Sequence, residues 1–336
     1  MRKGGTGKRP ETASSGPAKA PALHILLMGN MSAGKSTLVN ALLGRGLLPS
    51  ANAATTAKIF RLVSRGDIPA GKLYAAADGR EVSKEDIRKY NGDGRDQSVE
   101  LVGCFSSMAH FGRDICLYDT PGPNTALHKG HGAILREFIA GQSFSHILCV
   151  LDATVHQTDD EKSLLADYIA AAQSKNRGAK VVFLMNKVDA LDEEREDPLP
   201  EVMASAGEWL KKHGFSEPIL LPVMAKAAYI LRAGANRADL SKDERRELPD
   251  ITKRLNARQG ELFAAAHMPA AARKEISQGL EPGFNYARPH IMLLLGIPFK
   301  VVSGTWARLV QETGLRTLEL LLEYDLRRKI ELQGRI

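Results

Sequence analysis

An eight-residue segment with the pattern G-x-x-x-x-G-K-S constrains this chain most, because it dictates both a local fold and a chemistry. The apolar run Leu23–Met28 precedes it, and Lys35–Leu43 carries apolar residues at helical spacing. Glycines let the backbone curl so that successive N–H groups face a phosphate at the start of the next helix. The segment predicts a phosphate-binding loop between a buried strand and a helix. Its residues are Gly29, Asn30, Met31, Ser32, Ala33, Gly34, Lys35 and Ser36, and Thr37 follows.

Two hydroxyl or charged side chains of this loop are candidates for phosphate and metal chemistry. We expect Lys35 to reach the β- and γ-phosphate oxygens of a nucleotide, and the Ser36 hydroxyl to bind Mg²⁺. A D-T-P-G segment begins at Asp119 and ends at Gly122, directly after a strand-like run. An acidic residue there can hold the hydration shell of Mg²⁺, and the Gly122 N–H can approach the γ-phosphate. The polar stretch from residue 49 to 56 offers Thr55 or Thr56 as a second hydroxyl ligand for the metal.

An N-K-V-D segment from Asn186 to Asp189 predicts which base is bound. We expect Asp189 to accept hydrogen bonds from guanine N1–H and the 2-amino group, while Asn186 braces the loop and Lys187 lies along the base. Adenine lacks this pair of donors, so a carboxylate left without partners would discriminate against it. Ala225 and Lys226 follow the last strand-like run, where a backbone N–H could meet the guanine oxygen.

Strand-like and helical segments alternate from residue 23 to residue 223. This alternation predicts the α/β class, with a P-loop NTPase three-layer sandwich and a mainly parallel central sheet. The expected strands are Leu23–Met28, Ala57–Val63, Lys72–Ala76, Val99–Phe105, Ile115–Tyr118, Ile147–Leu151, Lys180–Met185 and Ile219–Val223. The expected helices are Lys35–Leu43, Ser83–Tyr90, His131–Ile139, Asp159–Ala172, Glu201–His213 and Gly314–Ile330, with charged helical sequence from Arg232 to Phe284.

The net charge of +7 is concentrated at the N-terminus. The first twenty residues carry five basic side chains and one acidic one, a net charge of +4, so the other 316 residues carry +3. This near balance makes nucleic acid an unfavoured partner. Residues 1–22 are rich in Gly, Ser, Pro and Lys, and we expect them to form a disordered basic tail.

The cysteines and the apolar runs point to a cytoplasmic protein. Cys104, Cys116 and Cys149 are odd in number and stand in apolar runs, so we expect reduced, buried thiols. No apolar run approaches the ~18 residues of a membrane span, and no secretory signal follows the basic N-terminus. Ile291–Val302 has the apolar character of a membrane-seeking stretch, but Gly296, Pro298 and Lys300 interrupt it, so we expect it to pack in the core instead.

Three segments of the chain resemble the dynamin superfamily. They are G-N-M-S-A-G-K-S-T-L-V-N-A-L-L-G at residues 29–44, Leu48-Pro49 with Thr56 seven residues on, and D-T-P-G-P-N at 119–124. The last form, followed by V-L-D-A at 150–153 and D-D-E at 159–161, is most similar to bacterial dynamin-like proteins. Within them it resembles the branch that includes the replication-clamp-associated and toxin-secretion-associated GTPases. The 84-residue interval from Lys35 to Asp119 also exceeds what small Ras-like GTPases need.

The resemblance covers residues 23–330 and implies an enlarged dynamin-type GTPase domain. It implies a helical insertion at 233–290, C-terminal helices and a short end at 331–336. It also implies hydrolysis of GTP to GDP and phosphate, with catalytic roles for Ser32, Lys35 and Thr56. Ser32 would place the attacking water and a charge-compensating K⁺ or Na⁺, and Thr56 would join Ser36 and Asp119 at Mg²⁺.

Two positions depart from known GTPase patterns. Met31 stands where eukaryotic dynamins usually have Gln, and Pro123 follows Gly122 where Ras-type GTPases have a catalytic Gln. By resemblance, catalysis would then depend on Ser32, Thr56, backbone groups and ions.

The resemblance also implies partners besides GTP and GDP. They are a second copy in a transient homodimer through the GTPase domain, and a stalk, carried by this protein or by a separate stalk-bearing partner. Peripheral membrane association and membrane remodelling are family properties that no segment of this chain supports by itself. Two alternatives stay open: a nucleotide-gated scaffold associated with DNA replication, and a regulatory GTPase associated with ribosomes or RNA. The latter would predict an appended RNA module and a shorter interval between the switch regions.

Overall fold

The computed structural model describes residues 22–49, 58–69, 72–92, 98–105, 114–121, 131–154, 167, 169–173, 178–191, 198–235, 240–280 and 299–333. Thr55, Thr56 and Gly122 lie outside these ranges, as does all but residue 22 of the expected tail at 1–22. Part of the expected helix Asp159–Ala172 is also outside them, and the described part of that segment is helical.

Within these ranges, eight strands form a single sheet in the order β3-β4-β2-β5-β1-β6-β7-β8. The pairs β2–β5 and β3–β4 are antiparallel and the other five neighbouring pairs are parallel, so the predicted mainly parallel sheet is confirmed. Mixed sheets of this kind are common in large α/β folds. The strands are β1 Leu23–Gly29, β2 Ile59–Ser64, β3 Leu73–Ala75, β4 Ser98–Gly103, β5 Ile115–Asp119, β6 His146–Asp152, β7 Lys180–Asn186 and β8 Ile219–Val223.

Burial explains why the strand positions could be predicted within two residues at each end. The central strands β1, β5 and β6 are buried along nearly their whole length, so they read as continuous apolar runs. Towards the edge, β4 has only two buried residues among six, and its first half is exposed or half-buried. The most buried part of the sheet is therefore β1 with its neighbours β5 and β6. Because these strands are parallel, their carboxyl ends lie next to one another.

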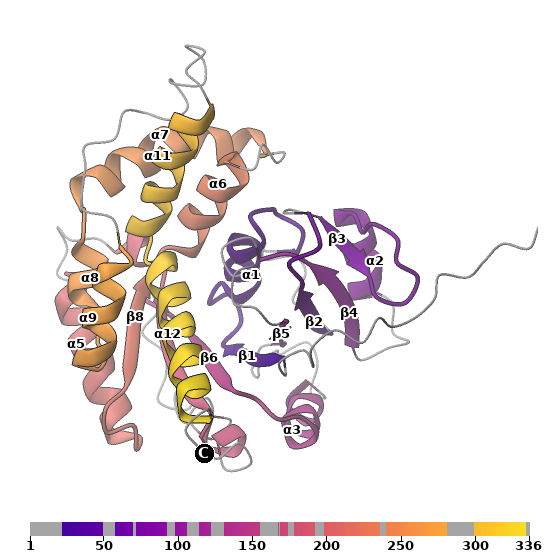
Figure 1. The fold of residues 1–336 in the computed structure, drawn as a ribbon, viewed down its shortest axis with the longest axis horizontal. Helices are drawn as coiled ribbons and strands as arrows, with labels where there is room; N and C mark the ends of the chain where they lie inside the picture. The colour runs from indigo at the N-terminus through magenta and orange to yellow at the C-terminus, as the bar shows by residue number, and fades with distance from the viewer. Residues whose placement is uncertain are drawn as a thin grey trace, which may run out of the picture.

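Helices surround the sheet and gather in two groups around its β6–β8 half (Figure 1). α6, α7 and α11 pack on one another at one end, whereas α5 and α8 contact β8 and α12 contacts α9. The helices are α1 Lys35–Leu43, α2 Lys84–Gly92, α3 His131–Gly141, α5 Leu199–Lys212, α6 Ala225–Ala235, α7 Lys242–Ala257, α8 Glu261–Ala265, α9 Ala270–Gln278, α11 Phe299–Glu312 and α12 Leu315–Gln333, with the 3-10 turn η2 Val188–Ala190.

The helix α6 was not expected from the sequence. Seven of its eleven residues are buried, so it reads as an apolar run that continues β8 rather than as an amphipathic helix. The helices α7 to α9 confirm the expected helical sequence after Arg232. One backbone pairing lies within that segment, because His267 forms an antiparallel bridge with Leu220 at the edge of β8. This pairing covers part of the sheet edge.

Residues 299–302 of Ile291–Val302 begin α11, but their side chains lie outside what the structure describes, so the expected core packing of this segment stays a prediction. Further along α11, Trp306 and Leu309 are buried. The thiols of Cys104, Cys116 and Cys149 are buried and unpaired by disulfides, as predicted. Among the helices of the described ranges, none is long and apolar enough to cross a bilayer.

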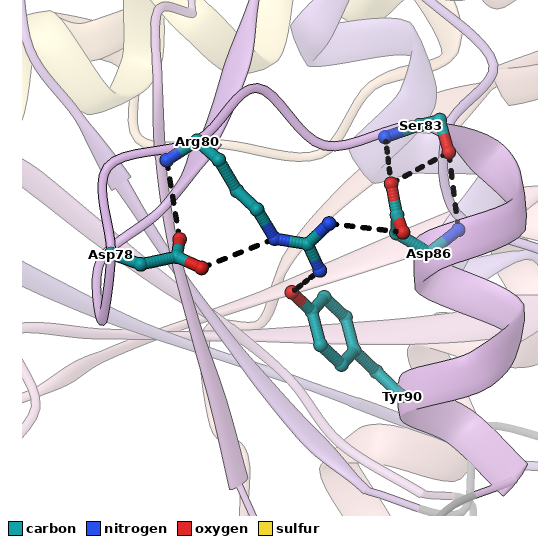
Figure 2. A network of polar contacts seen from close by, with 5 residues as sticks. All are labelled: Asp78, Arg80, Ser83, Asp86 and Tyr90. Carbon is teal, nitrogen blue, oxygen red and sulfur yellow. Dashed lines mark hydrogen bonds and ion pairs between the residues drawn. The ribbon is translucent and has the colours of Figure 1, made fainter.

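A polar network on the surface joins the turn after β3 to α2, as Figure 2 shows. Arg80 donates to the Tyr90 hydroxyl at 3.0 Å and pairs with Asp78 at 3.2 Å and Asp86 at 3.4 Å. Ser83 and Asp86 cap the start of α2 reciprocally, since the Asp86 N–H donates to the Ser83 hydroxyl at 3.2 Å and the Ser83 N–H donates to the Asp86 carboxylate at 3.0 Å. This cap agrees with the helix start expected at Ser83.

Candidate functional site

The loop between β1 and α1 requires glycine at both of its ends. Gly29 has a φ of 147°, and a Cβ there would lie 2.3 Å from the carbonyl oxygen of Val150 in β6. Gly34 has a φ of 98°, and its Cβ would lie 2.2 Å from Nδ2 of Asn186. Neither position can accept a larger residue without displacing its neighbours. The loop is therefore held closely against β6 and against the segment that begins at Asn186.

Lys35 is buried at the base of this loop. Its Nζ donates to the carbonyl oxygens of Gly29 at 2.7 Å and Asn30 at 2.9 Å. Burial lowers the pKa of Lys35, and the charges of Asp119 and Cys149 act in the opposite direction. Because both hydrogen-bond acceptors are neutral, the ammonium favours an anionic ligand at the loop.

A carboxylate and a hydroxyl meet beside Lys35. The Ser36 hydroxyl donates to Oδ2 of Asp119 at 2.8 Å. Asp119 is fully buried, and its Oδ1 has no hydrogen-bond partner among the described residues. Burial raises the pKa of Asp119 to about 6, opposed by Lys35 and by the Ser36 hydrogen bond. A buried carboxylate oxygen without a partner, next to a serine hydroxyl, fits a small hard cation such as Mg²⁺.

We expect the buried charge of Asp119 to make stability depend on pH. Its pKa of about 6 lies above the ordinary 3.8, so the native state binds the proton more tightly than the unfolded state. The free energy of unfolding of the nucleotide-free protein should therefore fall as the pH rises from 3.8 to about 6. Asp119→Asn removes the charge, and we expect it to raise the free energy of unfolding at pH 7 by ~1–2 kcal/mol while Mg²⁺-dependent GTP binding is lost. Urea denaturation of both proteins from pH 4 to pH 8 measures this, and equal stability at pH 7 would contradict it.

One side chain, that of Asn186, joins the phosphate loop to the two segments on its other side. Its Nδ2 donates to the Ala33 carbonyl at 2.8 Å, and its Oδ1 accepts the Ala225 N–H at 3.0 Å. Asn186 is almost fully buried, so both bonds are protected from water. The bracing role expected for Asn186 agrees with these contacts. The Ala225 N–H is thereby engaged by Asn186 in this structure.

Lys187 is positioned by a residue that the sequence did not indicate as functional. Its backbone is left-handed, with a φ of 64°, and its Nζ lies 2.6 Å from Oδ2 of Asp152. Asp152 also accepts the N–H and hydroxyl of Thr154 at 2.9 and 2.7 Å. Burial acts to raise the pKa of Asp152, but the hydrogen bonds from Lys187 and Thr154 hold it below its ordinary value. Asp152 ends β6 opposite Asn186 in the strand register, within the V-L-D-A segment at 150–153.

The remaining candidate residues take different positions. Asp189 is half-buried in η2, and its backbone carbonyl accepts a hydrogen bond from Arg254 of α7 at 3.0 Å. The Lys226 side chain pairs with Glu247 of α7 at 2.7 Å. Met31 and Ser32 are exposed at the tip of the phosphate loop, whereas Thr37 is half-buried in α1.

The structure thus brings together the carboxyl ends of the parallel strands β1, β5, β7 and β8. Three hydrogen bonds connect the site residues there. Lys35 donates to the Asn30 carbonyl, Ser36 donates to Asp119, and Asn186 donates to the Ala33 carbonyl. Ligands of open α/β sheets bind at the carboxyl ends of the strands. Thr56 and Gly122, the other expected members, lie outside the described residues.

Residues 25–188 match the family model described as the Dynamin family. Dynamin-like protein A of Bacillus subtilis (strain 168) is 26% identical over 204 residues, which are 59% of this chain and 16% of that protein. An uncharacterized protein in the xynA 3' region of Caldicellulosiruptor sp. (strain Rt8B.4) is 22% identical over 211 residues, 62% of this chain and 50% of that protein. The chain therefore spans half or less of the length of these curated relatives.

A solved structure is similar over a larger part of the chain. It is an oligomerised bacterial dynamin pair, described as providing a mechanism for the long-range sensing and tethering of membranes. The alignment covers 82% of this chain and 46% of that one, with 17% identity and a TM-score of 0.46.

Proposed function

We propose that this chain is a dynamin-superfamily GTPase that binds GTP and GDP and hydrolyses GTP to GDP and phosphate. The match of residues 25–188 to the Dynamin family supports the proposal. The observation that carries the proposal is the pair of hydrogen bonds made by Asn186. They tie the phosphate loop at Ala33 to Ala225 and to the N-K-V-D segment, so the phosphate side and the base side form a single site.

Each part of the site has its own task in this proposal. The loop N–H groups and Lys35 hold the phosphates, while Ser36 and Asp119 hold Mg²⁺. Mg²⁺ bound there would neutralise charge on the β- and γ-phosphate oxygens. The carboxylate of Asp189 accepts the two guanine donors, and Lys187, held by Asp152, lies along the base.

Hydrolysis by this site needs a group that stabilises the charge developing between the β- and γ-phosphates. By resemblance we assign water placement to Ser32 and Thr56, with K⁺ or Na⁺ near Ser32 as the compensating charge. Ser32 and Met31 are exposed at the tip of the loop, where a second copy of the chain can reach them. That exposure supports a transient homodimer that meets across its nucleotides.

The proposal also includes a cellular role for the protein. Membrane remodelling as a peripheral membrane protein, a stalk-bearing partner and the replication-clamp-associated or toxin-secretion-associated branch all follow from resemblance. The family match favours a dynamin-like GTPase over an RNA-associated or replication-associated regulator.

Nucleotide titration and turnover test the central claim. We expect the protein to bind GTP and GDP at least about tenfold more tightly than ATP, because adenine cannot satisfy the Asp189 carboxylate. We also expect slow GTP turnover. Equal affinity for ATP and GTP, or no turnover with Mg²⁺ at any protein concentration, would contradict the proposal.

The turnover assay, repeated at several protein and potassium concentrations, tests the homodimer separately from GTP binding and hydrolysis. If two copies complete the site, turnover per molecule should rise with protein concentration and with potassium. Light scattering in GDP with aluminium fluoride should then detect a dimer. A monomer with concentration-independent turnover would leave a GTPase and remove the dimer.

A further inference from the structure

The helix α7 contacts both segments on the base side of the site. Arg254 donates from Nη1 to the carbonyl oxygen of Asp189 at 3.0 Å, and Glu247 pairs with Lys226 at 2.7 Å. These partners stand in η2 and at the start of α6, so α7 bridges the two loops that follow β7 and β8. The expected helical insertion is therefore attached to the base side of the site by polar contacts.

We propose that Arg254 is a positioning residue for guanine recognition, which holds the backbone of Asp189 from α7. The inference rests on the proposed function, because it presupposes that Asp189 accepts the guanine donors. Arg254 does not touch the base in this proposal. It acts by restricting the short turn that carries the carboxylate.

The turn η2 depends on contacts from outside itself. It comprises three residues, and 3-10 turns have poorer hydrogen-bond geometry than α-helices. Before the turn, Asn186 and Lys187 are fixed by Ala33, Ala225 and Asp152. At Asp189 itself, the hydrogen bond from Arg254 fixes the backbone. A charged donor makes a stronger hydrogen bond than a neutral one, so this contact restrains the carbonyl and with it the side chain of Asp189.

Arg254 stands on the open face of α7, so its role can be tested without disturbing the core. The side chain is exposed and, with Asp250, Lys253 and Ala257, lines a hollow of about 510 Å³. The opposite face of α7 is buried through Leu248, Ile251, Thr252 and Leu255, which keep the helix in place. Truncation of Arg254 therefore removes the bond to Asp189 and leaves no cavity in the core. Because the contact is solvent-accessible, its effect should be moderate.

The test compares Arg254→Ala with Arg254→Lys and with a matched control on the same helix, Arg246→Ala. Arg246 is exposed and pairs only loosely with Asp243, at 3.6 Å. In the full chain we expect Arg254→Ala to weaken GDP binding by about 3–10-fold. Discrimination between GDP and IDP, whose base lacks the 2-amino group, should shrink by a similar factor. Arg254→Lys should recover part of both effects, since it keeps a charged donor, and Arg246→Ala should match the wild type.

Pyrophosphate binding and nucleotide-free thermal melting separate positioning from a general structural role. Both should be unchanged in Arg254→Ala, because the phosphate loop and the core do not contact Arg254. The inference is overturned if Arg254→Ala binds GDP as the control does, or if it loses pyrophosphate and GDP affinity equally. A wild type that binds ADP as well as GDP would instead overturn the proposed function.

Discussion

Lys35→Ala should lower GTP affinity by at least about 100-fold, since it removes charge-assisted hydrogen bonds to phosphate oxygens. The Lys35 Nζ is buried and bonded to the carbonyls of Gly29 and Asn30, so the ammonium is already held inside the loop. A phosphate arriving there meets a desolvated cation, whose attraction for an anion is stronger than in water. Isothermal titration with GTP and with GDP measures the loss, and turnover should fall to the level of the buffer.

The control for this prediction is Lys211→Ala. Lys211 is exposed on α5 and pairs with Glu208 at 2.8 Å, away from the phosphate loop, so its loss should leave binding unchanged. Denaturation with urea should show that Lys35→Ala still folds, because the substitution also removes the cost of burying a charge. Undiminished GTP turnover in Lys35→Ala would mean that the loop does not bind the phosphates.

The sequence could predict the part of the site that is built from consecutive residues. The phosphate loop needs Gly29 and Gly34 for backbone reasons, and the structure explains both through their approach to Val150 and Asn186. The central strands could be predicted because burial on both faces makes them continuous apolar runs. The bracing by Asn186 followed from the same local reasoning.

The contacts that the sequence did not predict connect residues far apart in the chain. Asp152 pairs with Lys187 across two adjacent strands, and Arg254 reaches Asp189 from α7. Neither pairing leaves a periodic pattern, because an exposed arginine on a charged helix is typical of a solvated face. The helix α6 was missed for the opposite reason, since its near-complete burial removes the amphipathic pattern.

The second prediction concerns the base. Asp189→Asn should weaken GTP binding by at least about 100-fold, because the carboxylate that accepts two guanine N–H donors is replaced by an amide, which itself presents an N–H donor to the base. The amide presents an N–H where the carboxylate accepted the guanine 2-amino group, and xanthine carries a carbonyl oxygen at that position. XTP should therefore bind Asp189→Asn more tightly than GTP does, which reverses the preference of the wild type.

Paired titrations with GTP and XTP measure the reversal, with Asp243→Asn as the matched control. Asp243 is an exposed acid in the first turn of α7 and should leave both affinities unchanged. Because Asn186 and Lys35 are intact in Asp189→Asn, pyrophosphate should bind as in the wild type, which shows that the phosphate side has kept its shape. A variant that binds pyrophosphate and still prefers GTP over XTP would mean that another group reads the base. One charged side chain to consider in that case is Arg254, whose guanidinium donates to the Asp189 carbonyl. Arg254→Ala in the Asp189→Asn background would test whether it reads the base.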